Sequence, residues 1–184
     1  MRHKDEDKAR RIKEAVIRLV LEQGFEGASV SKIAKEAGVS PSTVYVYYEN
    51  KEQMLASIYE EYSVNIYEYL CSQVHCGMDG GQIVSALMHG YHDYIRKNYE
   101  IFKFLEQCAH CPSLCDGKKK EDVCSSYATI DEMRAKGIFK DYSAECLATV
   151  MFSPVKSIAR YYPEDYARDL LNEVVSLIRD SILL

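Results

Sequence analysis

Apolar residues recur every three or four positions through most of this chain, and this spacing constrains the fold more than any other feature. Ile12, Val16 and Leu19 begin one such stripe, which is typical of an amphipathic helix. The chain has only four prolines and nine glycines. No segment alternates Val, Ile or Thr with polar residues, as a half-buried strand would. The sequence therefore predicts an all-α fold.

Breaks between the expected helices divide the chain into a small N-terminal part and a larger C-terminal part. A first helix is expected to end at Gly24, because glycine readily adopts the left-handed conformation that follows many helices. The later helices are expected over residues 30–37, 41–48, 51–71, 82–97, 100–108, 121–136, 143–161 and 163–184. Short connections favour antiparallel neighbours. We therefore expect a three-helix domain over residues 1–50 and an antiparallel helical domain over residues 51–184.

Polar residues with short side chains mark the starts of three of these helices. Ser29, Ser40 and Asn50 each directly precede an expected helix, and such side chains accept a free backbone amide at a helix N-terminus. Gly38 lies in the turn between the two short helices, and Pro41 follows Ser40, where its missing N–H costs nothing. A helix, a glycine-containing turn and a second short helix form the helix-turn-helix motif, whose second helix enters the DNA major groove.

The charge of the chain limits where DNA could bind. The formal net charge is −5, and an acidic protein is a poor nonspecific binder of polyanions. Residues 1–53 contain ten Lys and Arg against nine Asp and Glu, whereas the remainder is strongly acidic. We therefore expect any DNA contact to be local and to lie in the N-terminal third.

A specific pattern of residues runs without interruption through residues 9–55. It consists of Gly24-Phe25, Ser29-Val30, Ile33-Ala34, Ala37-Gly38-Val39-Ser40, Thr43-Val44-Tyr45, Tyr47-Tyr48 and Lys51-Glu52. This pattern resembles the N-terminal signature of the TetR family of transcriptional regulators. The resemblance implies an N-terminal helix-turn-helix DNA-binding domain followed by a C-terminal helical domain for ligand binding and dimerisation.

The resemblance also assigns expected DNA contacts by position. Together with the N-cap Ser29, the expected DNA-binding residues are Ser29, Ser31, Pro41, Ser42, Thr43, Tyr45, Tyr47 and Lys51. This chain departs from the common pattern at three positions. Pro41 and Ser42 stand where a polar or basic residue and a glycine are usual, and Ser31 stands where some members have arginine. These departures reduce the charged donors available for guanine, so we expect Thr43 and Tyr45 mainly to hold phosphates.

A single small reading head makes few base contacts, so specificity normally requires two heads on adjacent half-sites. Each of the last two expected helices carries an apolar stripe, and the family dimerises through a four-helix bundle. The two stripes are Leu147, Ala148, Met151, Val155 and Ile158, and Leu170, Val174, Leu177, Ile178 and Ile182. The alternative is that both stripes pack only within their own subunit. Pro154 is expected to kink or interrupt the first of these helices.

The resemblance implies that the middle helices enclose a small-molecule effector whose binding respaces the two heads. The candidate ligand-binding residues are Tyr59, Tyr62, Ile66, Met88, Tyr91, Tyr94, Phe102, Phe104 and Tyr127. Fifteen tyrosines and five phenylalanines favour an aromatic effector or one of mixed polarity. Alternatively, these aromatic residues simply form the core.

A cluster of cysteines suggests that something other than an organic effector could control DNA binding. Cys108, Cys111, Cys115 and Cys124 lie close together in the sequence, with His110 among them. Zinc takes four Cys or His ligands, but this spacing is not that of a paired C-x2-C site. Unrelated structural thiols, a metal site and a redox-responsive pair therefore all remain open.

Two histidines have a spacing that can chelate a metal on a helix. His89 and His92 lie three residues apart, although a position in solvent or in a pocket lining is the favoured interpretation. The leading prediction therefore includes no metal and no cofactor.

Other function classes find little support. The sequence has no glycine-rich phosphate loop, no H-E-x-x-H and no G-x-S-x-G, so we expect no enzymatic activity and no catalytic residue. A charged N-terminus and the lack of a long apolar run predict a cytoplasmic protein without a membrane partner.

The function expected from these features is that of a repressor. It would bind a palindromic double-stranded DNA operator as a homodimer and be released by an unknown small molecule in the C-terminal domain. The alternative is a regulator with the same DNA head that senses metal or thiol oxidation through the Cys108–Cys124 cluster.

Overall fold

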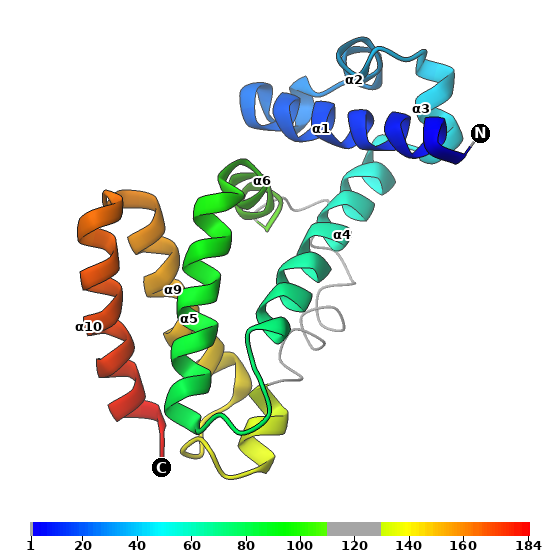
Figure 1. Cartoon of the computed structure of the whole chain (residues 1–184). Helices are drawn as coiled ribbons and strands as arrows, with labels where there is room; N and C mark the ends of the chain where they lie inside the picture. The colour runs from blue at the N-terminus through cyan, green and yellow to red at the C-terminus, as the bar shows by residue number, and fades with distance from the viewer. Residues whose placement is uncertain (1, 110–129) are drawn as a thin grey trace. The chain divides into compact units, whose positions relative to one another are not determined.

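The computed structural model describes residues 2–109 and 130–184, with side chains described from residue 5 onward. These residues form helices joined by short connections (Figure 1), and their only β-type pairing is a single bridge between Phe139 and Leu183. The all-α prediction is confirmed. Among the helices of this part of the chain, none has both the length and the apolarity that crossing a lipid bilayer demands.

The described residues divide into two compact units. The first, which we call the head unit, contains residues 2–63 and 99–109; the second, the body unit, contains residues 64–98 and 130–184. This division reflects which residues pack together and does not test where the DNA-binding domain ends. The functional boundary expected between residues 50 and 51 stays a prediction.

The head unit is built from the first three helices, the start of the fourth, and one later helix. These helices are α1 (Arg2–Gly27), α2 (Val30–Ala37), α3 (Pro41–Tyr47), α4 (Lys51–Ser72) and α6 (Tyr99–Ala109). Gly24 interrupts the regular backbone of α1 with φ of 71°, as expected from the stop signal. α1 packs against both α2 and α6. The apolar side chains buried in this unit include Ile12, Val16, Ile33, Met54, Ile58 and Phe104.

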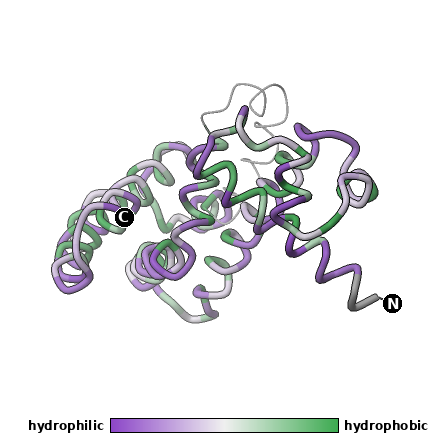
Figure 2. Tube along the Cα trace, turned by 90° about the horizontal axis from the view of Figure 1, so that it is seen from above, coloured by the Kyte–Doolittle hydropathy of each residue, from purple (hydrophilic) through white to green (hydrophobic). Residues whose placement is uncertain are grey.

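The body unit contains the end of α4 and three further helices. These are α5 (Gly80–Lys97), α9 (Ala144–Tyr161) and α10 (Glu164–Ile182), together with a helical turn over residues 130–135. α5, α9 and α10 pack against one another. Hydrophobic and hydrophilic residues alternate within the turns of the helices (Figure 2), which is the pattern of helices with one apolar face. The largest fully buried side chains here include Met88, Ile95, Leu147, Met151 and Leu171.

Most expected helix boundaries agree with the structure to within a residue or two. The largest difference is the end of α1, which lies at Gly27 rather than at Gly24, although the backbone leaves helical geometry at Gly24. α5 begins at Gly80, two residues before its expected start, because Asp79 and Gln82 form a reciprocal capping box. Pro154 lies inside α9 without interrupting it, so the expected interruption does not occur. The helix expected over 121–136 is described only from residue 130.

The apolar stripe expected on α9 does not face a partner. Its residues, Leu147, Ala148, Met151, Val155 and Ile158, are all buried within this single chain. On α10, Ile178 and Ile182 are also buried, whereas Leu177 is 66% exposed. The α9 stripe is therefore not available as the dimer interface expected from the sequence, because α9 packs against α5 and α10. On α10, Leu170, Val174 and Leu177 are partly or fully exposed, so the part of the prediction that concerns this helix stays a prediction.

Asn50 supplies the N-terminal cap of α4 and gives a testable measure of head stability. Its side-chain oxygen accepts the backbone N–H of Gln53 at 2.7 Å. We expect Asn50→Ala to lower the free energy of unfolding by about 1 kcal/mol, measured by urea denaturation. Asn65→Ala changes an exposed asparagine in the middle of the same helix and should change stability by no more than about 0.5 kcal/mol. Equal effects of the two substitutions would contradict a capping role.

Candidate DNA interface

The turn between α2 and α3 is fixed by local backbone and side-chain bonds. Ser29 caps α2 by accepting the N–H of Lys32, and Ser40 caps α3 by accepting the N–H of Thr43 at 3.2 Å. Gly38 ends α2 in the left-handed conformation, with φ of 64° and ψ of 38°. Both serine caps agree with the sequence prediction, and the result is a complete helix-turn-helix.

One face of α3 is buried and the opposite face is open. Val44 is 1% exposed and anchors the helix in the core of the head unit, as expected. Pro41, Ser42, Tyr45 and Val46 are exposed. Because no described side chain covers these four residues, they form a surface that is available to a DNA groove.

The hydroxyl groups at the start of α3 are already ordered by one another. The Ser40 hydroxyl lies 2.8 Å from the hydroxyl of Ser42 and 2.8 Å from that of Thr43. Thr43 is half-buried, whereas Ser42 is exposed. A phosphate approaching this end of α3 would therefore meet Ser42 more readily than Thr43.

Tyr47 has an intramolecular role that its sequence position does not reveal. Its hydroxyl donates to the carbonyl oxygen of Asp5 at 3.1 Å and lies 3.4 Å from that residue's carboxylate. Burial and the Asp5 charge raise the pKa of Tyr47. The bond joins the end of α3 to the start of α1. Tyr47 therefore orients the reading helix, and its contact with DNA stays a prediction.

Most basic side chains of the head unit are paired within the chain. Lys13 forms an ion pair with Glu61, Arg18 pairs with Glu36, and Arg11 donates to the carbonyl oxygen of Ala37 at 3.0 Å. The last bond fixes the end of α2, where helix carbonyls lack intrahelical partners.

Lys35 and Lys51 have no ion pair or hydrogen bond within the described residues of the head unit. Lys51 is an expected DNA contact. Lys35 was missed by sequence reasoning, although it lies one helical turn after the expected contact Ser31 and is exposed, as Ser31 is. Among the described basic side chains of α1, α2, α3 and the start of α4, these two lysines are the ones left available for phosphate.

The candidate ligand-binding residues fall in both units. Tyr59, Tyr62, Phe102 and Phe104 belong to the head unit, Ile66, Met88, Tyr91 and Tyr94 belong to the body unit, and Tyr127 lies outside the described residues. Phe104 and Met88 are fully buried core residues.

The body-unit tyrosines take part in aromatic contacts. Tyr91 packs edge-on against Phe152 with ring centres 5.1 Å apart, and Tyr94 packs against Tyr69 at 5.3 Å. These contacts support a core role for the two tyrosines, and their assignment to an effector site stays a prediction.

The candidate metal ligands that the structure describes do not form a metal site. The two ring nitrogens of His89 lie 2.8 Å from the Ser85 carbonyl oxygen and 2.8 Å from the Asn172 amide oxygen, so both are occupied. His92 is buried in the body unit. Within the described part of the chain, no three His, Cys, Asp or Glu residues are grouped as a metal site. Cys108 is buried in α6, whereas Cys111, Cys115, Cys124 and His110 lie outside the described residues.

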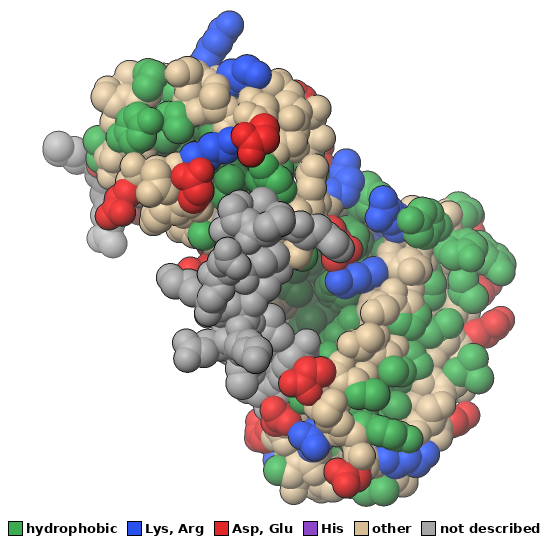
Figure 3. Space-filling view, turned by 180° about the vertical axis from the view of Figure 1, so that it is seen from behind, with side chains coloured by type: hydrophobic (Ala, Val, Ile, Leu, Met, Phe, Trp, Pro, Cys, Tyr) green, Lys and Arg blue, Asp and Glu red, His purple; other side chains and the backbone are tan. Residues whose placement is uncertain are grey.

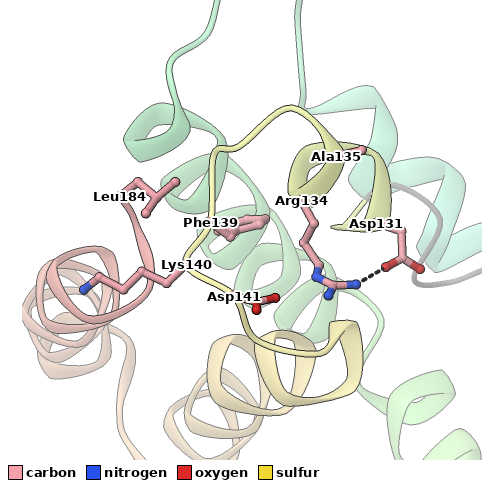
Figure 4. A pocket seen from close by; sticks show the side chains of 7 residues that line it. All are labelled: Asp131, Arg134, Ala135, Phe139, Lys140, Asp141 and Leu184. Carbon is pink, nitrogen blue, oxygen red and sulfur yellow. Dashed lines mark hydrogen bonds and ion pairs between the residues drawn. The ribbon is translucent and has the colours of Figure 1, made fainter.

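The body unit has an open cavity of about 500 Å³. It is lined by Asp131, Arg134, Ala135, Phe139, Lys140, Asp141 and Leu184 (Figure 4). Arg134 pairs with Asp131 at 2.8 Å, and the Lys140 ammonium donates to the Ser181 carbonyl oxygen at 2.9 Å. None of the candidate ligand-binding residues that the structure describes lines this cavity.

Comparison with known proteins agrees with the geometry of the head. Residues 12–58 match the family model described as bacterial regulatory proteins of the tetR family. Residues 12–58 are therefore an N-terminal DNA-binding domain of the tetR type. The match covers the capped turn, α3 and the start of α4, and so includes the surface described above.

Among similar proteins is the fatty acid metabolism regulator protein of Bacillus subtilis, which is 44% identical over 48 residues. The aligned stretch spans 26% of this chain and only 25% of that relative.

Two solved structures share the fold over nearly the whole chain. A TetR family transcription regulator from Marinobacter aquaeolei is 24% identical with a TM-score of 0.83, covering 100% of this chain and 99% of that one. The regulator FadR from Bacillus subtilis in complex with stearoyl-CoA is 17% identical with a TM-score of 0.70, covering 91% and 96%.

The unpaired lysines predict the salt dependence of DNA binding. We expect Lys51→Ala and Lys35→Ala each to weaken binding to all DNA sequences alike and to reduce the slope of log K against log salt by about 0.9. Lys97→Ala, which removes an exposed lysine at the end of α5, should leave the slope unchanged. The measurement is fluorescence anisotropy on labelled duplexes between about 50 and 300 mM salt, a range over which the Debye length falls from about 14 to about 6 Å. An unchanged slope for Lys35→Ala would exclude its phosphate contact.

Tyr48, the buried residue that ends α3, predicts how the stability of the chain depends on pH. Burial, with a contribution from the Glu61 charge, raises the pKa of Tyr48 to about 12. Its neutral form is thus favoured in the folded state, and stability present below pH 10 is lost as the pH rises from about 10 to 12. We expect Tyr48→Phe to flatten this alkaline loss, measured by urea denaturation at a series of pH values. Tyr142→Phe, which changes an exposed tyrosine, should leave the alkaline loss of stability as it is in the unchanged protein. If the stability of Tyr48→Phe falls with pH as steeply as that of the unchanged protein, Tyr48 is not the group responsible.

Proposed function

We propose that this chain is a ligand-responsive repressor that binds a palindromic operator as a homodimer in the cytoplasm. The observation that carries the proposal is the open face of α3, held on a capped helix-turn-helix whose unit also has two unpaired lysines, Lys35 in α2 and Lys51 at the start of α4. A bound repressor acts by occupying a promoter, which requires no contact with the polymerase. The match over residues 12–58 supports the DNA-binding part.

A dimer would use the outer faces of α9 and α10, which include three residues of the stripe expected on α10 but none of the buried stripe expected on α9. Here apolar residues are left uncovered: Tyr161 is 69% exposed, Leu177 is 66% exposed, and Val150 and Tyr166 are also exposed. Figure 3 shows hydrophobic side chains spread over this face of the body unit. We name this the dimer surface: Val150, Pro154, Tyr161, Tyr166, Leu170, Val174 and Leu177. Large uncovered apolar surfaces of this kind mark interaction sites.

An effector in the body would act by favouring one spacing of the two heads over the other, since a ligand that binds both equally shifts nothing. The candidate effector residues are those expected from the sequence. Stearoyl-CoA is a suitable first probe, because a FadR structure of the same fold contains it. The alternative trigger, metal or thiol oxidation at Cys108–Cys124, is tested by adding zinc, a chelator or an oxidant in the same assay.

The test of the proposal is selection of bound sequences from randomised duplex DNA by the full-length chain. We expect an inverted repeat, bound by two chains, with affinity that falls steeply as salt rises. Each probe is then added to the complex, and release of DNA identifies the trigger. Recovery of no preferred sequence, with salt-independent binding, would exclude the regulator function.

The dimer surface makes a separate prediction. Leu177→Glu places a charge among exposed apolar residues, and we expect it to convert the dimer to a monomer and weaken operator binding at least tenfold, because only one half-site is then held. Native mass spectrometry gives the oligomeric state. Ser176→Glu adds the same charge at an exposed position outside the surface and should leave the dimer intact. A dimer that survives Leu177→Glu would mean that another surface joins the chains.

A further inference from the structure

Val46 is the most open hydrophobic side chain of the head unit. It is 79% exposed, compared with 56% for its neighbour Tyr45, while Val44 on the opposite face is buried. A single exposed valine is common on protein surfaces. Its position decides its significance here, because it lies on the one face of α3 that the chain leaves open.

The rest of α3 lacks the side chains that usually read bases. Direct recognition of guanine relies on the paired donors of Arg or Lys, and recognition of adenine relies on Asn or Gln. Residues 41–47 read Pro-Ser-Thr-Val-Tyr-Val-Tyr and contain none of these four types. The paired hydrogen bonds that usually distinguish purines are therefore not available from this helix.

The remaining polar groups of α3 are mostly engaged. The Thr43 and Ser42 hydroxyls are paired with Ser40, and the Tyr47 hydroxyl donates to Asp5. Apart from the hydroxyl of Tyr45, which is exposed and is expected to hold a phosphate, the contact that α3 offers without competition from its own chain is apolar. In the major groove, the apolar group that distinguishes one base from the others is the 5-methyl group of thymine.

We propose that Val46 recognises the 5-methyl group of a thymine in each operator half-site and that this contact sets the sequence preference of α3. The inference rests on the proposed DNA-binding function and adds to it the chemistry by which the sequence is read. The preferred half-site accordingly holds a thymine at a fixed position opposite α3, and its methyl group matters more than its hydrogen-bonding edge.

The test combines removal of the methyl group with removal of the side chain. The operator selected by the full-length chain is resynthesised with deoxyuridine in place of each thymine in turn, which deletes only the methyl group. We expect one position per half-site at which this change weakens binding about fourfold, the effect of exposing roughly one buried methyl group. Val46→Ala should weaken binding to the unmodified operator by a similar factor and should be insensitive to deoxyuridine at that position.

Two further variants control the experiment. Val46→Thr keeps the size of the side chain and one of its methyl groups, so it should retain part of the sensitivity to deoxyuridine. Val64→Ala changes an exposed valine outside the reading head and should bind every duplex as the unchanged chain does. Circular dichroism confirms that each variant is folded.

The outcomes separate this inference from the function on which it rests. If the chain selects an operator but the effects of Val46→Ala and deoxyuridine are independent at every thymine, Val46 does not read a methyl group and the inference fails alone. A selected half-site with no thymine would also overturn it. If the chain selects no sequence at all, the DNA-binding function itself fails.

Discussion

The anchoring of α3 is the constraint on which the reading head depends. A helix of seven residues is too short to persist by its own hydrogen bonds in water. It is held instead by burial of Val44 and Tyr48, by the Ser40 cap at its start and by the Tyr47 bond to Asp5 at its end. These contacts come from three directions, so the exposed side chains keep a fixed orientation without taking part in holding the helix.

Local features of the head could be predicted from the sequence because their causes are local. The serine caps at positions 29 and 40, the turn at Gly38 and the inward position of Val44 each follow from residues within one helical turn. The bond between Tyr47 and Asp5 joins residues 42 apart, and no periodicity predicts it. Lys35 was overlooked for another reason: which lysines are free depends on where the acidic partners of the others lie in space.

The helices of the body show the limit of pattern reasoning more clearly. Periodicity correctly predicted that α9 has an apolar face at Leu147, Met151 and Ile158, but it could not say which surface buries that face. The structure buries it within the chain and leaves a second stripe through Val150 and Tyr161 uncovered. Sequence periodicity indicates only the stronger of the two apolar faces of α9, so the dimer interface was assigned to the face that is buried within the chain. Effector-binding residues are harder still to predict from the sequence, because an aromatic residue gives the same pattern whether it lines a binding site or fills a core.

The bond from Tyr47 to Asp5 also has a practical consequence for handling the protein. It ties the reading helix to the first turn of α1, so whatever precedes Asp5 in an expressed chain lies next to the DNA-reading surface. An affinity tag fused at that end would disturb operator selection, whereas one fused after Leu184 would be attached to the body unit. Assays of sequence preference are therefore best made with a C-terminal tag or with none.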